Sequence, residues 1–286
     1  MGVHGRSEPP EVLVDGRPDR SIGVEDRGLH YGDGLFETIA FRGGRPCLWQ
    51  AHLDRLRAGA VRLGIPPPSD GLLREEVRRL LDGQDAGTLK LMLTRGIGPR
   101  GYRPPALAQP TRILLRYPIA PPTRGWSEPA VAVTLCRVRM GANPALAGLK
   151  HLNRLEQVMA RSEWDDPAIA EGLLCDARGR LVGGTMTNLF LVRDGGLRTP
   201  RLDEAGVAGT VRARVLHHAR ALGMALYEEH LYPRDLEHAD GAFLTNALIG
   251  CQPIGRVDGL ALDAGAVPSD LLACVQRDVF EPEPDW

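Results

Sequence analysis

Apolar residues in the first 120 positions recur with a helical spacing and then with a strand-like one. Residues 49–63 carry an apolar side chain at every third or fourth position and Gly64 then ends the pattern, which predicts a helix. A second helix is predicted over residues 71–82, which follow two good N-cap residue types. The runs 88–94 and 112–117 alternate only in part, which indicates strands with one well-buried face.

Residues that break helices and strands concentrate between Tyr117 and Ala130, where four prolines and a glycine occur. Such a density is typical of a linker, so we expect a smaller N-terminal α/β domain over residues 1–120 and a larger C-terminal α/β domain over residues 121–286. Helical patterns and strand-like runs mix beyond the linker, which predicts a mixed α/β (α+β) architecture instead of a regular Rossmann repeat. The tail, residues 281–286, is expected to fray. The predicted helices are residues 152–163 and 210–222, and the predicted strands are residues 130–136, 172–176, 181–182, 188–192 and 241–245.

The composition favours a small-molecule partner. Apolar residues make up 43% and charged residues 25%, and the formal net charge is −1, so the chain lacks the basic field that nucleic acid or an anionic membrane requires. No run approaches the ~20 apolar residues that span a bilayer, and the polar N-terminus is unlike a signal peptide, so we expect a cytoplasmic protein. The five cysteines are widely spaced and odd in number, which favours reduced packing residues over a disulfide framework or a metal site.

Lysine is scarce in this chain. Of 35 basic residues only Lys90 and Lys150 are lysines, and arginine cannot form an imine. Lys150 follows a stretch broken by glycine and proline and precedes the predicted helix 152–163, whose inner stripe is predicted to hold Leu152, Leu155 and Met159. A lysine at such a junction can simply be solvated, but its scarcity favours a chemical role. Lys90 lies within a predicted strand and matches no cofactor motif, so we interpret it either as a structural residue or as one that snorkels at a strand edge.

The sequence around Lys150 resembles a known family. Residues 148–156 read Gly-Leu-Lys-His-Leu-Asn-Arg-Leu-Glu, and this run resembles the cofactor-binding segment of the aminodeoxychorismate lyases, which are class IV aminotransferases and fold-type IV pyridoxal-phosphate enzymes. Further blocks occur in the order typical of that family, from about Asp26 to Ala247. They are residues 26–38 (DRGLHYGDGLFET), 49–56 (WQAHLDRL), 94–102 (TRGIGPRGY) and 188–190 (NLF). The resemblance implies a two-domain fold like that of D-amino acid aminotransferases.

The resemblance also implies a pyridoxal 5'-phosphate cofactor and the residues that hold it. Lys150 matches the lysine that forms a Schiff base with the cofactor, and Arg55 matches the arginine that binds its phosphate. The plain alternative for Arg55 is a solvated helix residue. The glycine-rich run 206–212 opens a predicted helix, and helix N-termini present free amides to an anion. The implied cofactor-binding residues of this second half are Gly209, Thr210, Val211, Thr245, Asn246 and Ala247.

The substrate that the resemblance implies is 4-amino-4-deoxychorismate, which would be converted by a homodimer to pyruvate and to 4-aminobenzoate for folate biosynthesis. This substrate carries two carboxylates, and planar arginine forks bind carboxylates in a bidentate manner. A flexible turn with solvated arginines is the alternative for the loop 95–102. The implied substrate-side residues are Tyr31, Phe36, Arg95, Arg100 and Tyr102, with Thr38 as a proton relay.

One position departs from the family pattern. Gly183 stands where a glutamate usually faces the pyridine nitrogen, so the cofactor ring is expected to be a weaker electron sink. A lyase tolerates this better than an aminotransferase does, because its product ring becomes aromatic. Glu171 or a water is a candidate to occupy the gap. Two alternatives stay open, namely an aminotransferase for D- or branched-chain amino acids and a non-catalytic relative that keeps the fold as a binding module; the presence of Lys150 argues against the second.

Overall fold

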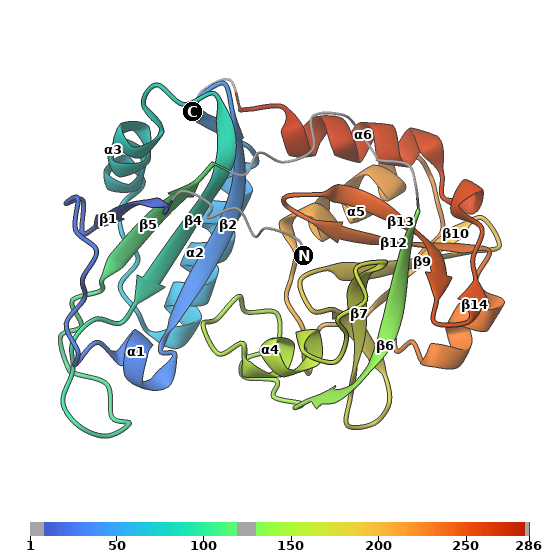
Figure 1. Cartoon of the computed structure of the whole chain (residues 1–286), viewed down its shortest axis with the longest axis horizontal. Helices are drawn as coiled ribbons and strands as arrows, with labels where there is room; N and C mark the ends of the chain where they lie inside the picture. Colours follow the sequence, from blue (N-terminus) through green and yellow to red (C-terminus); the bar gives the residue numbers. More distant parts are fainter. Residues whose placement is uncertain (1–8, 119–129, 284–285) are drawn as a thin grey trace. The chain divides into compact units, whose positions relative to one another are not determined.

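The computed structural model describes residues 9–118, 130–283 and 286, and these residues form two compact units (Figure 1). The first unit comprises the residues up to the linker together with the last six residues, and the second ends at Phe280. The predicted linker falls largely on residues 119–129, which lie outside the described residues. Every helix that the structure describes is too short or too polar to cross a bilayer.

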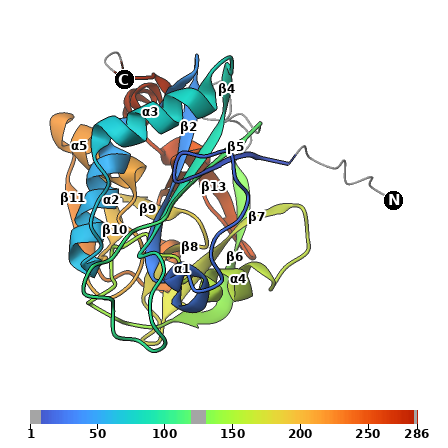
Figure 2. The same cartoon turned by 90° about the vertical axis from the view of Figure 1, so that its left-hand side faces the viewer.

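The first unit is an antiparallel sheet with two helices on one face (Figure 2). The helices predicted from periodicity form as α2 (Trp49–Leu63) and α3 (Asp70–Leu81), and each buries its apolar stripe. Ser69 caps α3 by accepting a hydrogen bond from the amide of Leu72, as its N-cap position predicts. A short helix, α1 (Arg27–Tyr31), lies between β1 and β2 in the chain. The strand order is β1 (Glu11–Val14), β5 (Arg112–Tyr117), β4 (Ala86–Thr94), β2 (Gly34–Arg42) and β3 (Arg45–Pro46).

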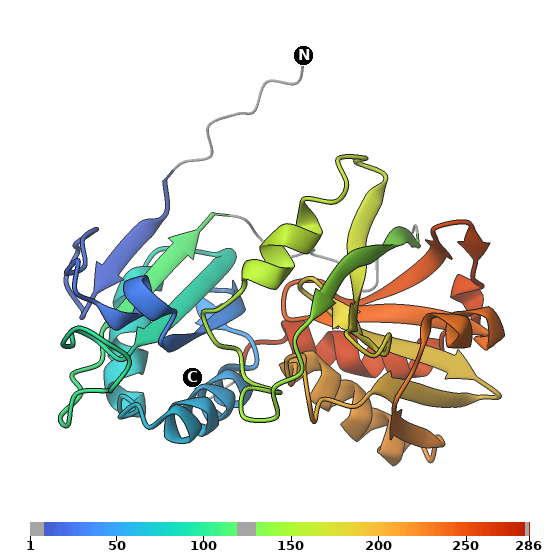
Figure 3. The same ribbon diagram turned by 90° about the horizontal axis from the view of Figure 1, so that it is seen from below.

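The second unit is a nine-stranded mixed sheet. Helices α5 (Thr210–Ala221) and α6 (Ser269–Phe280) pack against each other and against β12 and β13, whereas α4 (Leu155–Arg161) contacts β6 and β7 (Figure 3). Pairs β10–β11, β13–β6 and β6–β7 are parallel, and the others are antiparallel. The strands in spatial order are β11 (Leu226–Glu229), β10 (Gly196–Pro200), β9 (Asn188–Arg193), β12 (Gly241–Asn246), β13 (Gly250–Val257), β6 (Val131–Met140), β7 (Ile169–Asp176) and β8 (Leu181–Gly184), with β14 (Leu260–Ala261) on β13; the 3₁₀ turns are Pro233–His238 and Ala264–Ala266.

Two expectations about packing were wrong. The helix predicted over residues 152–163 begins only at Leu155, because Arg154 is not helical and its Nε donates to the carbonyl of His151. Its predicted inner stripe is not buried either, since Leu155 is 70% exposed and Met159 is 54% exposed. The tail does not fray within its described residues: Pro282 bridges Cys47, and the ring of Trp286 packs edge-on against Trp49 at 6.2 Å. These contacts place the last six residues with the first unit, although they were assigned to the C-terminal domain.

Candidate active site

Backbone pairing ties Lys150 to the glycine-rich loop of residues 206–209. The amide of Gly148 donates to the carbonyl of Gly206, and the amide of Ala208 donates to the carbonyl of Gly148, both at 3.0 Å. Gly148 has a φ of +81°, a left-handed conformation that favours glycine. The segment that carries Lys150 is therefore anchored two residues away from the lysine, on the loop that leads into α5.

This loop packs against Asn188, the first residue of β9. The Asn188 side chain donates to the carbonyl of Val207 at 2.9 Å. Gly209 is the N-cap residue of α5, and a Cβ there would lie 2.0 Å from the Asn188 Oδ1. Only glycine fits that position without movement of the asparagine. The amides of Thr210 and Val211 open α5, where free amides and the helix dipole favour an anion.

Thr245 completes this group from the neighbouring strand. It lies directly opposite Asn188 in the β12–β9 pairing and is 1% exposed. Its Oγ1 has no hydrogen-bond partner among the described residues. A buried hydroxyl without a partner costs about 1–3 kcal/mol, so its hydroxyl is well suited to an acceptor on a bound group. The arrangement fits the phosphate of the expected cofactor.

Asn246 ends β12, and Ala247 follows it in the turn that joins β12 to β13. The Asn246 Oδ1 accepts hydrogen bonds from the amides of Leu248 and Ile249, at 2.8 and 2.9 Å. This oxygen is therefore used to shape the turn.

In the first unit, Arg55 belongs to a buried ionic cluster. Its Nε donates to Glu37 Oε1 at 2.8 Å and its Nη2 donates to Glu37 Oε2, while His52 Nδ1 lies 2.6 Å from the same Oε2. Burial by itself would raise the pKa of Glu37, but the charge and hydrogen bonds of Arg55, together with His52, lower it to about 2. The alternative of a solvated Arg55 is wrong, because its side chain is only 15% exposed.

Arg95 is held by the protein, contrary to its predicted substrate role. Its Nε and Nη2 bind the Asp33 carboxylate at 2.7 and 3.0 Å, and its Nη1 and Nη2 donate to the carbonyls of Gly64 and Leu63 at 2.7 and 2.8 Å. Burial would raise the pKa of Asp33, but hydrogen bonds from Arg95 and Arg27 lower it. The guanidinium of Arg95 thus joins the α2 end to the α1 segment, and we drop it from the proposed substrate contacts.

The remaining residues of the arginine loop are more accessible. Arg100 is exposed and Tyr102 is 85% exposed. The Tyr102 ring lies 5.4 Å from the ring of Tyr31, whose hydroxyl accepts a hydrogen bond from the amide of Gly101. Arg27 holds this cluster by donating to the carbonyls of Gly101 and Tyr102. The structure thus brings Tyr31 and Tyr102 together.

Phe36, Thr38 and Lys90 share the sheet face opposite α2. Glu37 faces α2, so its neighbours on β2 point the other way. Thr38 lies directly opposite Lys90 on β4, and the Lys90 Nζ lies 5.5 Å from the centre of the Phe36 ring. Of the two interpretations of Lys90, the one that places it at a strand edge was wrong, because β4 lies between β5 and β2 in the sheet.

The backbone at Gly183 explains why no glutamate stands there. Gly183 has a φ of +155°, and a Cβ would lie 2.8 Å from the carbonyl oxygen of Thr187. Glu171 is buried nearby. Its carboxylate already accepts hydrogen bonds from the residues around it and thereby closes the turn before Asn188. The donors are the amides of Gly172, Thr185 and Met186 and the hydroxyls of Thr185 and Thr187, at 2.5–3.2 Å.

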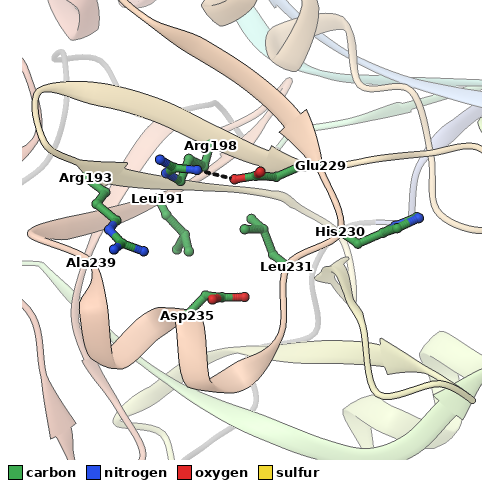
Figure 4. Close-up of a pocket in the computed structure, with 8 residues that line it drawn as sticks. All are labelled: Leu191, Arg193, Arg198, Glu229, His230, Leu231, Asp235 and Ala239. Atoms are coloured by element: carbon green, nitrogen blue, oxygen red, sulfur yellow. Dashed lines mark hydrogen bonds and ion pairs between the residues drawn. The ribbon is translucent and has the colours of Figure 1, made fainter.

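A pocket of about 160 Å³ lies at the opposite end of β9 from Asn188 (Figure 4). It is lined by Arg193 and Arg198, and Arg198 is already paired with Glu229 at 2.5 Å. None of the predicted site residues lines it.

The sequence did not single out Asn188 or Glu37 for a role. Each lies in a block that carries the family resemblance, NLF and GDGLFET, and that is the only signal that marked them.

The fold, and a lysine segment whose backbone pairs with the loop before a helix N-terminus, define a mixed α/β protein suited to binding an anionic group. The chain matches Amino-transferase class IV over residues 34–257 and belongs to that family. It is 34% identical to an aminodeoxychorismate lyase of Vibrio harveyi, over 85% of this chain and 90% of that one. The crystal structure of 4-amino-4-deoxychorismate lyase from Pseudomonas aeruginosa is 45% identical, with a TM-score of 0.86 over 93% of this chain and 98% of that one.

A pyridoxal-phosphate-bound structure of a hypothetical aminotransferase from Mycobacterium tuberculosis matches with a TM-score of 0.76, at 22% identity, over 94% of this chain and 98% of that one. At that identity the likeness shows the fold alone. The predicted mixed α/β fold of the fold-type IV enzymes is confirmed.

Proposed function

We propose that the protein is a pyridoxal-phosphate-dependent lyase that converts 4-amino-4-deoxychorismate to 4-aminobenzoate and pyruvate. The observation that supports the cofactor is the backbone pairing of the Lys150 segment, through Gly148, with the loop that leads to the N-terminus of α5, together with the unpartnered hydroxyl of Thr245. The substrate is supported by the two lyases that this chain resembles at 34% and 45% identity.

The residues that would hold the cofactor divide by chemistry. The amides of Thr210 and Val211, the hydroxyl of Thr245 and the guanidinium of Arg55 would bind the phosphate, and Lys150 would be the covalent anchor. Charge-assisted bonds of this kind contribute about 1.5–3 kcal/mol each. When bound, the cofactor supplies a carbonyl that joins to amines and a ring that withdraws electrons.

Two side chains would move protons. With substrate bound, the amine of Lys150 would be the general base that removes the proton from the amino-bearing ring carbon. The neighbouring His151 does not add a positive charge at neutral pH, because burial, followed by the charge of Arg154, lowers its pKa to about 4. The hydroxyl of Thr38, or a water, would relay a proton to the departing enolpyruvyl group.

The decisive experiment measures 4-aminobenzoate and pyruvate formed from enzymatically generated aminodeoxychorismate with added cofactor. Wild type should form both products and Lys150→Ala neither. The matched control is Lys90→Ala, which removes the only other lysine and should keep the visible absorbance of the bound cofactor. If wild type binds cofactor and transfers amino groups without forming aminobenzoate, the aminotransferase alternative replaces the proposal. A wild type that binds no cofactor would favour the non-catalytic relative.

The homodimer belongs to the same proposal. Leu155, Val158 and Met159 lie on one face of α4 at helical spacing and are 54–70% exposed, which is unusual for a face with no partner. We propose that a second copy covers this face, that the protein works in the cytoplasm, and that its product serves folate biosynthesis. Leu155→Glu should shift the molecular mass measured by light scattering from two chains to one, whereas an unchanged mass would exclude α4 from the interface.

A further inference from the structure

Glu37 lies at the centre of the ionic cluster in the first unit and has no role in the chemistry above. It stands in the middle of β2, is 1% exposed, and points at α2. His52 and Arg55 are three residues apart on α2 and therefore share the helix face that meets β2. The carboxylate of Glu37 thus binds both side chains, which lie 15 and 18 residues further along the chain.

The two bonds to Arg55 use a fixed geometry. Nε and Nη2 each meet a different oxygen of Glu37, so the planar fork of the guanidinium is set by the carboxylate. Burying a charged pair is costly, and such pairs are weak evidence for stability but a recognised means of fixing orientation. Because the pKa of Glu37 is lowered to about 2, the carboxylate is ionised throughout the physiological range.

We propose that Glu37 is a positioning residue that presents Arg55 to the phosphate of the cofactor. This inference rests on the proposed function, in which Arg55 binds that phosphate. The long arginine side chain would otherwise lose its rotational freedom when the phosphate arrives. With the fork already set, that ordering occurs during folding and is not repeated on binding, which is how preorganisation raises affinity.

A second buried pair in the same unit offers a matched control. Glu76 on α3 is also 1% exposed and binds Arg112 through the same kind of fork, with Oε1 2.8 Å from Nη2. Neither residue matches a cofactor motif. Losing either glutamate's charge disrupts a comparable ionic contact, so a general loss of stability should appear in both variants.

The experiment measures dissociation constants of apoprotein for pyridoxal phosphate and for pyridoxal, which lacks the phosphate, in wild type, Glu37→Gln and Glu76→Gln. We expect Glu37→Gln to weaken the binding of pyridoxal phosphate about tenfold or more, which corresponds to a loss of ~1.4 kcal/mol. The affinity for pyridoxal should be unchanged. Glu76→Gln should lower the melting temperature without changing either constant. In a double-mutant cycle, Glu37→Gln should add little to Arg55→Gln, because Glu37 acts through Arg55.

The possible failures are distinguishable. A wild type that binds no pyridoxal phosphate would refute the proposed function and this inference with it. If wild type binds pyridoxal phosphate and folded Glu37→Gln binds it with the same affinity, the inference alone is overturned. It is also overturned if Glu37→Gln weakens the binding of pyridoxal as much as that of pyridoxal phosphate. If Glu37→Gln does not fold, Glu37→Asp takes its place: it keeps the charge but shortens the reach to Arg55, and unchanged affinity for pyridoxal phosphate would count against positioning.

Discussion

Two loops that the sequence marks as binding segments differ in how their donors are used. In the arginine loop, residues 95–102, Arg95 is the buried charged side chain, and acceptors of the protein itself take its hydrogen bonds. The glycine loop, residues 206–209, carries no charged side chain, yet it leads to open amides at α5 beside an unpartnered Thr245 hydroxyl. A charged residue in a loop is therefore a weaker sign of a ligand than donors that the fold leaves without acceptors.

Removal of Arg95 should show the scaffold role most strongly. Arg95→Gln breaks a buried pair, leaves Asp33 with Arg27 as its remaining cation and leaves two carbonyls without their donor, so we expect the free energy of unfolding to fall by about 3–5 kcal/mol. Urea denaturation of the apoprotein measures it. Arg100→Gln is the control within the loop, since Arg100 is exposed and its loss should leave stability unchanged. If Arg95→Gln keeps its stability and instead raises KM, Arg95 is a substrate ligand after all.

A methyl group at Gly209 should damage the other loop. The Cβ of Gly209→Ala would meet Asn188 Oδ1 at 2.0 Å, so the loop or the asparagine must shift and the start of α5 moves with it. We expect cofactor affinity to fall by about a hundredfold, equivalent to ~2.7 kcal/mol. Gly259→Ala serves as control because nothing lies within 4 Å of the Cβ there. Equal affinity in the two variants would show that this loop does not contact the cofactor.

Two buried threonines of the second unit, Thr199 and Thr245, separate binding from packing. Thr245→Val removes a hydroxyl without a protein partner, so the apoprotein should be as stable as wild type while cofactor affinity falls about tenfold. Thr199→Val removes a hydroxyl that donates to the carbonyl of Leu189 at 2.8 Å, so it should cost ~1 kcal/mol of stability and leave cofactor affinity intact. Calorimetry with and without cofactor distinguishes them, and a destabilised Thr245→Val apoprotein would contradict the comparison.

The last expected effect is confined to acid pH and concerns the stability contributed by His151. Its pKa falls from an ordinary 6.5 to about 4 in the folded chain, so below pH 6.5 the unfolded chain binds a proton that the folded chain does not. The free energy of unfolding should therefore fall as pH drops from 6.5 to 4, with a slope that corresponds to the uptake of at most one proton on unfolding. His151→Gln should flatten this part of the plot of stability against pH. Urea midpoints across this pH range measure the slope. An unchanged slope would mean that His151 is protonated as readily in the folded chain as in the unfolded one.

The sequence by itself determined the elements with strong periodicity and the lysine. Residues 49–63 form α2 with the predicted bounds, and α5 begins at Thr210 as the glycine run predicts, because a helical stripe and a capping glycine are local signals. The scarcity of lysine and the blocks around Lys150 and Arg55 likewise identified the family, which the comparisons confirm.

Only the tertiary structure decided which side chains have partners. Arg95 meets Asp33 across 62 residues and Glu37 meets Arg55 across 18, so whether a donor is satisfied depends on contacts that no local window contains. The same reason explains α4, whose apolar stripe predicted burial although the described residues leave Leu155 70% exposed and Met159 54% exposed. Periodicity reports what a helix could bury, and the rest of the fold decides what it does bury.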